Sequence, residues 1–526
     1  MTGVRFNLTE NPWLPVVRLN GATDEVDLVT LLTQAHRIRR ILGQTPPMTV
    51  ALHRMVLALM HRAYGPVNAA AWADMWRADS LPTPKLPTDR FELFDNERPF
   101  FQCPAVAQVP AASAAKLVPY RAVGNNTTLF DHTVATDQVR LSPAEAARWL
   151  VTLQAYDPGG LKTPYAKEKS SQAAPGNGMG MVLIESSTLK ETLLLNLMPY
   201  SPDDGLPRTT DTDDCPAWET DPPRPEPDAR HPKGWTDLLT WPSRRVWLAR
   251  GSGDDPHVDQ VVITPGTRLL GEPHDNEWMA AYRRPKISEG RAKRGQAPKP
   301  RYGPWRSVRL DAHRGIWRFS QELLLAPTGA AERHWQRPAA LDHVAQMVLN
   351  DIIPRDAVYT LRVFGQQLDD NRTVIEQVLE ETVAAPVALL RADYPVAGPV
   401  IGHSIELANH VGSALTKMER DHRAQFRAEA ASSLHLSYWP RLTDPFDVFL
   451  RTLAQALSAS ASPVSVTEAW ARQIRTIADQ AAVRWAEGSP RQGRNLEVAG
   501  ECYGRFTEQL DHEISAYHGH LAGYIA

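Results

Sequence analysis

Apolar residues recur every three or four positions along residues 48–63 of this 526-residue chain. Met48, Leu52, Met55, Leu59 and Met60 would share one face of a helix, so this spacing predicts a helix whose apolar stripe packs into a core. Further helices are predicted over residues 28–40 and 188–197. Short apolar runs beside turn residues are typical of strands, and they occupy residues 13–18, 181–184, 246–249 and 261–264.

A helix-start signal lies at residues 142–145. Ser142 can act as the N-cap, Pro143 fits the first helical position and Glu145 completes a capping box. The helix should end near Asp157, because Pro158 cannot continue it and the two glycines that follow tolerate positive φ. Loops are predicted over residues 159–180 and over the Pro- and Asp-rich residues 201–232.

The pattern becomes almost wholly helical from about residue 373. Helices are predicted near residues 373–391, 398–424, 444–458, 465–487 and 494–521, which favours a C-terminal helical bundle. The chain is also longer than one hydrophobic core usually serves. We therefore expect an α+β protein, with a mixed α/β domain over residues 1–372 and a helical bundle over residues 373–526.

The charge of the chain is balanced overall and concentrated locally. A net charge of -3 and a pI near 6.6 give no global attraction to phosphate, so any contact with nucleic acid must be local. Residues 283–306 carry nine Lys or Arg and one acid, Glu289, among glycines and prolines. This run predicts a mobile basic loop that contacts phosphates without reading sequence, and a solvated charged loop is the alternative.

Known catalytic motifs are absent from the sequence. It contains no GxxxxGK[ST], HExxH or GxSxG motif and no Cys/His cluster, so we expect no enzyme, no metal and no cofactor. Asp369 and Asp370 could hold a metal only with ligands from other segments, and solvated acids before a turn are the simpler interpretation. Three widely spaced cysteines support neither a disulfide framework nor zinc. Without a signal peptide or a long apolar run, a cytoplasmic protein outside the membrane is expected.

Five short motifs follow one another in a recognisable order: FNLTENPWLPV at residues 6–16, ERPFFQ at 97–102, GNNTTLFDH at 124–132, LLNL at 194–197 and PAW at 216–218. Together they resemble the CasA large-subunit family of type I-E CRISPR Cascade complexes, over nearly the whole chain. The resemblance implies a large mixed α/β N-terminal domain followed by a C-terminal four-helix bundle.

The resemblance also implies a non-catalytic function in antiviral defence. Such a subunit recognises the protospacer-adjacent motif (PAM) in double-stranded DNA, begins strand separation that leads to the R-loop, and helps to recruit a helicase-nuclease. Guide pairing supplies the sequence specificity, and the protein checks only the short motif. The implied partners are the crRNA 5′ end and the backbone, small and crRNA-processing subunits of Cascade.

Two loops acquire roles through this resemblance. The segment with Phe130, Asp131 and His132 resembles a loop that contacts the backbone subunit and the crRNA 5′ end, where Phe130 could stack on a base or fill a local core. Gly159, Gly160 and Leu161 match a glycine loop that lies in the minor groove, where a backbone without Cβ atoms can approach base edges. A helix C-cap is the structural alternative for these glycines, and both roles can hold.

Residues 364–373 resemble a hairpin whose amide side chain wedges beneath the motif. Alignment without gaps places Asn371 at the wedge, next to Asp370, and Gln366 or Gln367 takes that place if the alignment shifts. An ordinary polar turn is the alternative. In the basic run, the implied DNA contacts include Arg283, Arg284, Lys286 and Arg294. Two other functions stay open: a metal-dependent nuclease that uses Asp369 and Asp370, and a structural scaffold that binds only guide RNA.

Overall fold

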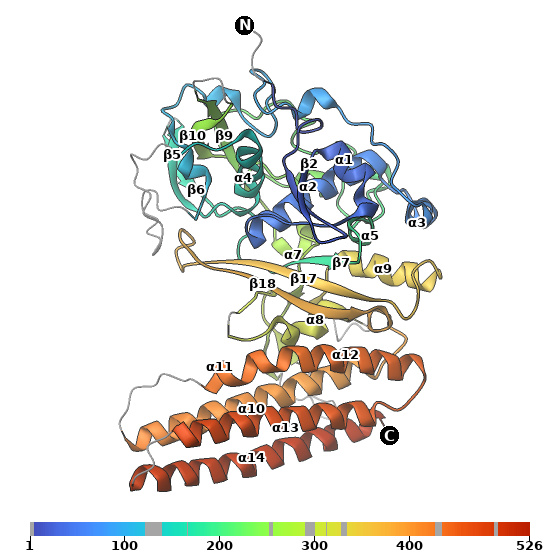
Figure 1. The fold of residues 1–526 in the computed structure, drawn as a ribbon, viewed down its shortest axis with the longest axis vertical. Coiled ribbons are helices and arrows are strands. Elements are labelled where there is room, and N and C mark those ends of the chain that lie inside the picture. The colour runs from blue at the N-terminus through green and yellow to red at the C-terminus, as the bar shows by residue number, and fades with distance from the viewer. Residues whose placement is uncertain are drawn as a thin grey trace. The chain divides into compact units, whose positions relative to one another are not determined.

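The computed structural model describes residues 5–120, 139–165, 167–251, 256–289, 300–311, 313–327, 334–426, 434–488 and 493–525. The chain forms two compact units (Figure 1). Unit 1 comprises Met1–Ala280 and Val363–Glu380, and unit 2 comprises Ala281–Arg362 and Glu381–Ala526. The sequence suggested one boundary after residue 372, but the chain passes between the units three times. The second and third crossings arise from a long hairpin, β17 (Val358–Leu368) and β18 (Ile375–Pro386), whose distal part belongs to unit 1.

Unit 1 mixes short helices with small sheets, in agreement with the expected α+β class. Its helices are α1 (Leu28–Thr33), α2 (Pro46–Tyr64), α3 (Ala69–Arg77), α4 (Pro143–Tyr156), α5 (Leu189–Leu195), α6 (Trp235–Leu239) and α7 (Pro273–Asn276). Its strands are β1 (Leu14–Arg18), β2 (Thr23–Val26), β3 (Ile38–Ile41), β4 (Ala112–Ser113), β5 (Gly160–Tyr165), β6 (Glu168–Ser171), β7 (Met181–Glu185), β8 (Asp228–Arg230), β9 (Arg244–Arg250), β10 (Val258–Pro265) and β11 (Thr267–Leu269).

The core of unit 1 forms around α2, which packs against α4 and α6. All five residues of its predicted apolar stripe are buried. Strands β2-β1-β3 form one antiparallel sheet, and β4-β10-β9 form another. The β5–β6 hairpin packs against β10 (Figure 1). These contacts fix the segment that follows α4, which carries the predicted glycine loop.

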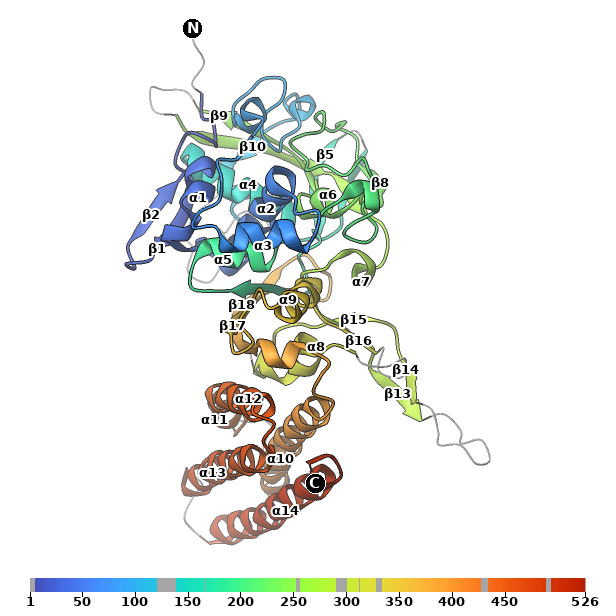
Figure 2. The same ribbon diagram turned by 90° about the vertical axis from the view of Figure 1, so that its right-hand side faces the viewer.

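Unit 2 contains the helical bundle and several short strands. Its strands are β12 (Tyr282–Arg283), β13 (Lys286–Glu289), β14 (Pro300–Tyr302), β15 (Arg306–Ser307) and β16 (Trp335–Gln336). Its helices are α8 (Ser320–Leu324), α9 (Ala339–Leu349), α10 (Ala397–Gln425), α11 (Leu434–Tyr438), α12 (Thr443–Ser458), α13 (Val464–Gly488) and α14 (Arg494–Ile525). The four long helices α10, α12, α13 and α14 lie side by side and bury residues at helical spacing, which confirms the expected bundle (Figure 2).

Four local predictions were wrong. Residues 28–40 form α1 and then β3, because Ile38–Ile41 pairs with β1. Residues 159–180 contain the β5–β6 hairpin, and the basic run contains the antiparallel pair β13–β14. Residues 373–391, predicted as a helix, form β18, which pairs with β17. In β3 and β18, pairing with another strand outweighs the local helix preference.

Candidate nucleic-acid interface

The glycine turn, residues 158–160, is set by the way α4 ends. The capping box of Ser142 and Glu145 is present, and the helix ends at Tyr156 with Asp157 as its C-cap, as predicted. Gly160 has φ +100°, a conformation that favours glycine. A Cβ on Gly159 would lie only 3.0–3.1 Å from backbone atoms of three other residues. The turn therefore needs both glycines for its own shape.

A buried charge network holds the glycine turn from behind. Arg244 Nε donates to Asp157 Oδ2 at 2.6 Å, and Lys162 Nζ lies 2.6 Å from the same oxygen. Arg244 Nη2 also donates to the carbonyl oxygens of Pro158 at 2.9 Å and Gln172 at 2.8 Å. Burial raises the pKa of the Asp157 carboxyl, but the charges of Lys162 and Arg244 outweigh it and hold the pKa below its usual value. The turn is thus fastened to β9.

The tip of the β17–β18 hairpin is a tight polar turn. Asp369 Oδ1 accepts from the amides of Thr373 at 2.6 Å and Val374 at 2.8 Å. These backbone hydrogen bonds, from Val374 first, lower the pKa of the Asp369 carboxyl. Asp370 and Asn371 are exposed at the tip. Asp369 therefore fixes the loop that presents the Asn371 amide.

The glycine turn and this hairpin tip lie side by side in unit 1. The Gly159 amide donates to the Arg372 carbonyl oxygen at 2.8 Å. A Cβ on Gly160 would lie 3.0 Å from Thr373 Cγ2. Two segments separated by more than 200 residues, both predicted to contact the same DNA motif, are thus joined by a direct hydrogen bond.

Gln366 does not take the exposed position suggested for it. Its side chain is 1% exposed, and its Nε2 donates to Tyr156 O and Asn177 Oδ1, both at 2.8 Å. Its Oε1 accepts from the Tyr120 hydroxyl at 3.0 Å. Because both ends of its amide are bonded inside unit 1, Gln366 positions the hairpin and is not available as the DNA contact that was predicted. Gln367 is half-buried in β17.

Exposed groups beside the glycine turn include some that the sequence interpretation missed. Leu161 is 72% exposed, in agreement with an available surface at the turn. Lys167 and Lys169 are also exposed, on the β5–β6 hairpin that starts at Gly160. The charged residues 167–169 lack the apolar alternation that predicts a strand, so no local signal indicated this hairpin. The buried Asp157–Arg244 pair left no local signal either.

The basic run of unit 2 forms a ribbon whose base is tied into the fold (Figure 2). Arg284 Nε donates to Gly303 O at 2.8 Å, and its guanidinium lies over the Trp305 ring. Arg283 stacks over Phe319 and lies 3.9 Å from Glu322 Oε1. These two arginines therefore have structural partners. Lys286 and Arg301 are exposed on the ribbon itself. Ile287, between them, is 68% exposed.

Several predicted residues lie outside the described part of the chain. They are Phe130, Asp131 and His132 of the crRNA loop, and Arg294 of the basic run. Among the described residues, no group of three or more His, Cys, Asp or Glu side chains is placed to hold a metal ion. Within the same residues, no helix combines the length and the apolar character needed to cross a membrane.

Comparison with known structures places this fold in one class, the CRISPR-associated proteins. Cse1 from Acidimicrobium ferrooxidans is similar with a TM-score of 0.78 and 25% identity, over 98% of this chain and 100% of that one. A chain of a CRISPR RNA-guided surveillance complex has the same fold, with a TM-score of 0.70 and 20% identity, over 97% of this chain and 100% of that one.

Sequence comparison narrows the class to a single family. The family described as CRISPR-associated protein Cse1 matches residues 7–481. CasA/Cse1 of Thermus thermophilus is 30% identical over 536 residues, which cover 94% of this chain and 98% of that protein. The chain belongs to the Cse1 family, as the ordered motifs indicated.

Proposed function

We propose that this chain is the non-catalytic large subunit of a type I-E Cascade complex, and that it recognises the PAM of double-stranded DNA in the cytoplasm. The observation that carries the proposal is the hydrogen bond from the Gly159 amide to the Arg372 carbonyl oxygen. It joins a glycine turn, suited to close approach in a minor groove, to a hairpin tip that exposes an amide. Membership of the Cse1 family supports the same function.

In this proposal the glycine turn reads the motif and the hairpin tip opens it. Leu161 is exposed next to the turn and can contact the groove. Asn371 can occupy the space of a stacked base while its amide bonds to displaced base edges, which reduces the cost of unstacking, a few kcal/mol per step. Asp370 lies beside it at the tip. The β-sheet that carries the tip holds Asn371 in place while the two DNA strands separate.

The basic ribbon supplies affinity without sequence discrimination. Lys286 and Arg301 contact phosphates, while Arg283 and Arg284 hold the base of the ribbon. The proposed partners are target DNA, the crRNA 5′ end with the backbone subunit at the loop of Phe130, the small and crRNA-processing subunits, and the helicase-nuclease. A surveillance complex that contains a chain of the same fold supports this assembly.

The test reconstitutes the crRNA-guided complex with and without this chain and measures binding to duplexes that carry or lack the motif. Loss of motif discrimination without the chain is expected, and equal discrimination would refute the proposal. Divalent-dependent cleavage by the chain alone would instead support the nuclease. The structure disfavours that alternative because Asp369 is bonded to backbone amides of its own turn.

A paired substitution tests the wedge. Asn371→Ala should slow strand opening more than it weakens duplex binding. Asn20→Ala removes an exposed amide from the β1–β2 turn and should leave the rate of strand opening and the affinity for the duplex unchanged. If Asn371→Ala weakens duplex binding and leaves the opening rate intact, the wedge assignment is incorrect.

A further inference from the structure

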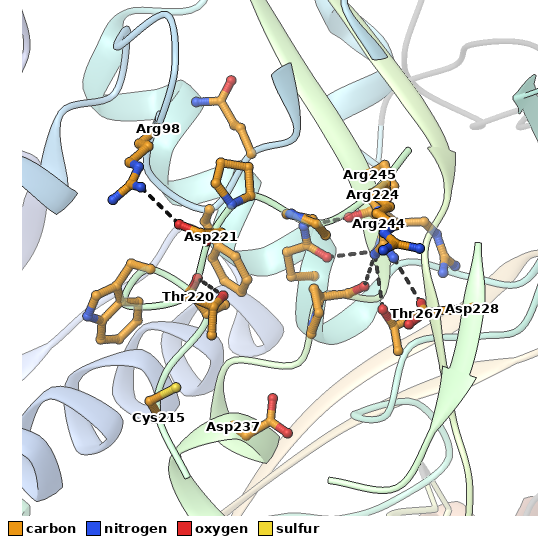
Figure 3. Close-up of a pocket in the computed structure, with 18 of the residues that line it drawn as sticks. Arg98, Cys215, Thr220, Asp221, Arg224, Asp228, Asp237, Arg244, Arg245 and Thr267 are labelled. Atoms are coloured by element: carbon orange, nitrogen blue, oxygen red, sulfur yellow. Dashed lines mark hydrogen bonds and ion pairs between the residues drawn. The ribbon is translucent and has the colours of Figure 1, made fainter. Parts of the chain in front are cut away.

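Unit 1 contains a cavity of about 620 Å³ that the DNA-binding proposal does not use (Figure 3). Most of its lining comes from three segments, residues 98–102, 215–237 and 242–245. The volume is within the range of sites that enclose small organic ligands. Residues 215–230 belong to the Pro- and Asp-rich segment predicted to be an exposed excursion. Trp218, which is 4% exposed and packs against Phe91 and Phe100, instead anchors it to the core.

The lining of the cavity is more basic than acidic, with seven Lys or Arg side chains and four Asp or Glu. Two of the lining arginines are already bonded. The buried Arg245 donates to Arg224 O, Thr267 Oγ1 and Asp228 Oδ1 (Figure 3). The half-buried Arg230 forms two bonds with Asp237. They hold the wall and have little capacity for a ligand.

The exposed cations of the lining are different. The Arg224 side chain has no hydrogen-bond or ion-pair partner among the described residues, although its carbonyl oxygen is bonded to Arg245. Lys233 has only a distant acid, Asp213, at 3.9 Å. Arg98 makes a single ion pair, with Asp221 at 3.0 Å (Figure 3). These three cations can therefore bind an anion without leaving another buried charge unpaired.

Part of the remaining lining is apolar and stiff. Five prolines contribute to it, and proline presents a ring and no N–H group, with φ fixed. Such a wall offers contact surface to an apolar group and loses little entropy when a ligand binds. The five are Pro99, Pro222, Pro223, Pro227 and Pro242.

We propose that this cavity binds a phosphorylated organic molecule of nucleotide size, with its phosphate on Arg224, unpaired among the described residues, and its organic part against the prolines. Guanidinium groups pair with phosphate through two parallel hydrogen bonds, so arginine suits this task. A cavity of this volume fits a free small molecule of that size. The site does not depend on the proposed DNA-binding function.

Ligand binding in the cavity should also be detectable at the glycine turn, because Arg244 contacts both. It lines the cavity and also donates to the Pro158 carbonyl oxygen of the glycine turn. A bound ligand should therefore slow amide hydrogen exchange in residues 215–230 and also in residues 158–172. This effect requires neither DNA nor other Cascade subunits.

The experiment measures calorimetric binding of AMP, ribose 5-phosphate, pyrophosphate and adenosine to the full chain. AMP should bind more tightly than pyrophosphate, and adenosine should not bind. Tighter binding of AMP than of ribose 5-phosphate would assign the ligand as a nucleotide, whereas equal binding would assign it as a sugar phosphate. The proposal would be overturned if neither AMP nor ribose 5-phosphate bound, or if adenosine bound as tightly as AMP.

Variants test the location of the site. Arg224→Gln should weaken AMP binding about tenfold, the effect of one charge-assisted hydrogen bond, without loss of stability. Arg77→Gln, an exposed change elsewhere in unit 1, should leave binding intact. Unchanged affinity in Arg224→Gln, or exchange protection confined to residues 283–302, would show that the anion binds elsewhere and would reject the site.

Discussion

Two hairpins of this protein are proposed to contact DNA, and they are built in opposite ways. The β17–β18 tip is fixed by Asp369 and by the hydrogen bond from Gly159, next to a buried ion-pair network. The β13–β14 ribbon is tied at its base by Arg284 and exposes charge and an isoleucine along its length. The β17–β18 tip therefore holds its backbone in a fixed position, and the β13–β14 ribbon supplies positive charge.

The difference separates specificity from affinity. Reading a short motif through backbone atoms requires the backbone to be in place before DNA arrives, because ordering it on binding costs about 1–2 kcal/mol per residue. Phosphate attraction acts over several ångströms and tolerates imprecise geometry. Substitutions in the two hairpins should therefore have different consequences for stability, motif discrimination and salt dependence.

The largest effect is expected from Asp157→Ala. The change leaves Arg244 and Lys162 without their shared buried carboxylate, and breaking such a pair costs about 3–5 kcal/mol. Urea unfolding should show a loss of this size and, in the reconstituted complex, motif discrimination should disappear. Asp74→Ala removes an exposed carboxylate from a long ion pair and should change stability by less than about 1 kcal/mol. Similar losses in the two variants would contradict the buried network.

Gly160→Ala should have the next largest effect. Positive φ costs alanine about 1–2 kcal/mol, and the new methyl group would press on Thr373. Gly21→Ala is the matched control, because Gly21 also has positive φ but its Cβ would meet no atom within 4 Å. Both variants should lose stability, and only Gly160→Ala should lose binding to motif-bearing duplexes. Equal DNA binding by the two variants would show that the glycine turn does not take part in recognition of the motif.

A smaller effect concerns the pH response of the hairpin tip. The pKa of Asp369 is lowered, so its stabilising hydrogen bonds are fully present above the carboxyl pKa of the unfolded chain and are lost as the pH falls through the folded-state pKa. The NMR signals of the Thr373 and Val374 amides should titrate below the usual aspartate range. Asp369→Asn should abolish this titration, and Asp370→Asn should retain it. A titration that persists in Asp369→Asn would assign it to another group.

The smallest effect is expected in the basic ribbon. Neutralising Lys286 and Arg301 together should weaken binding equally for all duplexes and lower the slope of log K against log salt by about one for each phosphate that is no longer neutralised. Arg355→Gln, an exposed change in unit 2, should leave the slope unchanged. A change in motif preference would mean that the ribbon also reads sequence.

Features with a local signal were predictable from sequence. The α4 helix begins with a capping box and is followed by Pro-Gly-Gly, and each of these signals lies within a few consecutive residues. Both hold in the structure. The position of the glycine turn followed from them. The bundle helices α10, α12, α13 and α14 were also predicted, since each buries its own apolar stripe.

Features that depend on distant partners were not predictable. Ile375, Val378, Leu379 and Val383 have helical spacing, but pairing with β17 makes them part of a strand. Asp157 and Arg244 are 87 residues apart, and neither has a distinctive neighbourhood. Gln366 was grouped with the exposed tip because sequence proximity does not show which amides are already bonded.

The discontinuous make-up of unit 1 limits how evolution or engineering can rearrange this protein. A cut after residue 372 would separate β17 from β18 and leave an open strand edge prone to self-association. A C-terminal segment that begins at residue 373 therefore cannot be exchanged between relatives as a unit. A functional chimera has to inherit both arms of the hairpin from one parent, with its crossover point after residue 386.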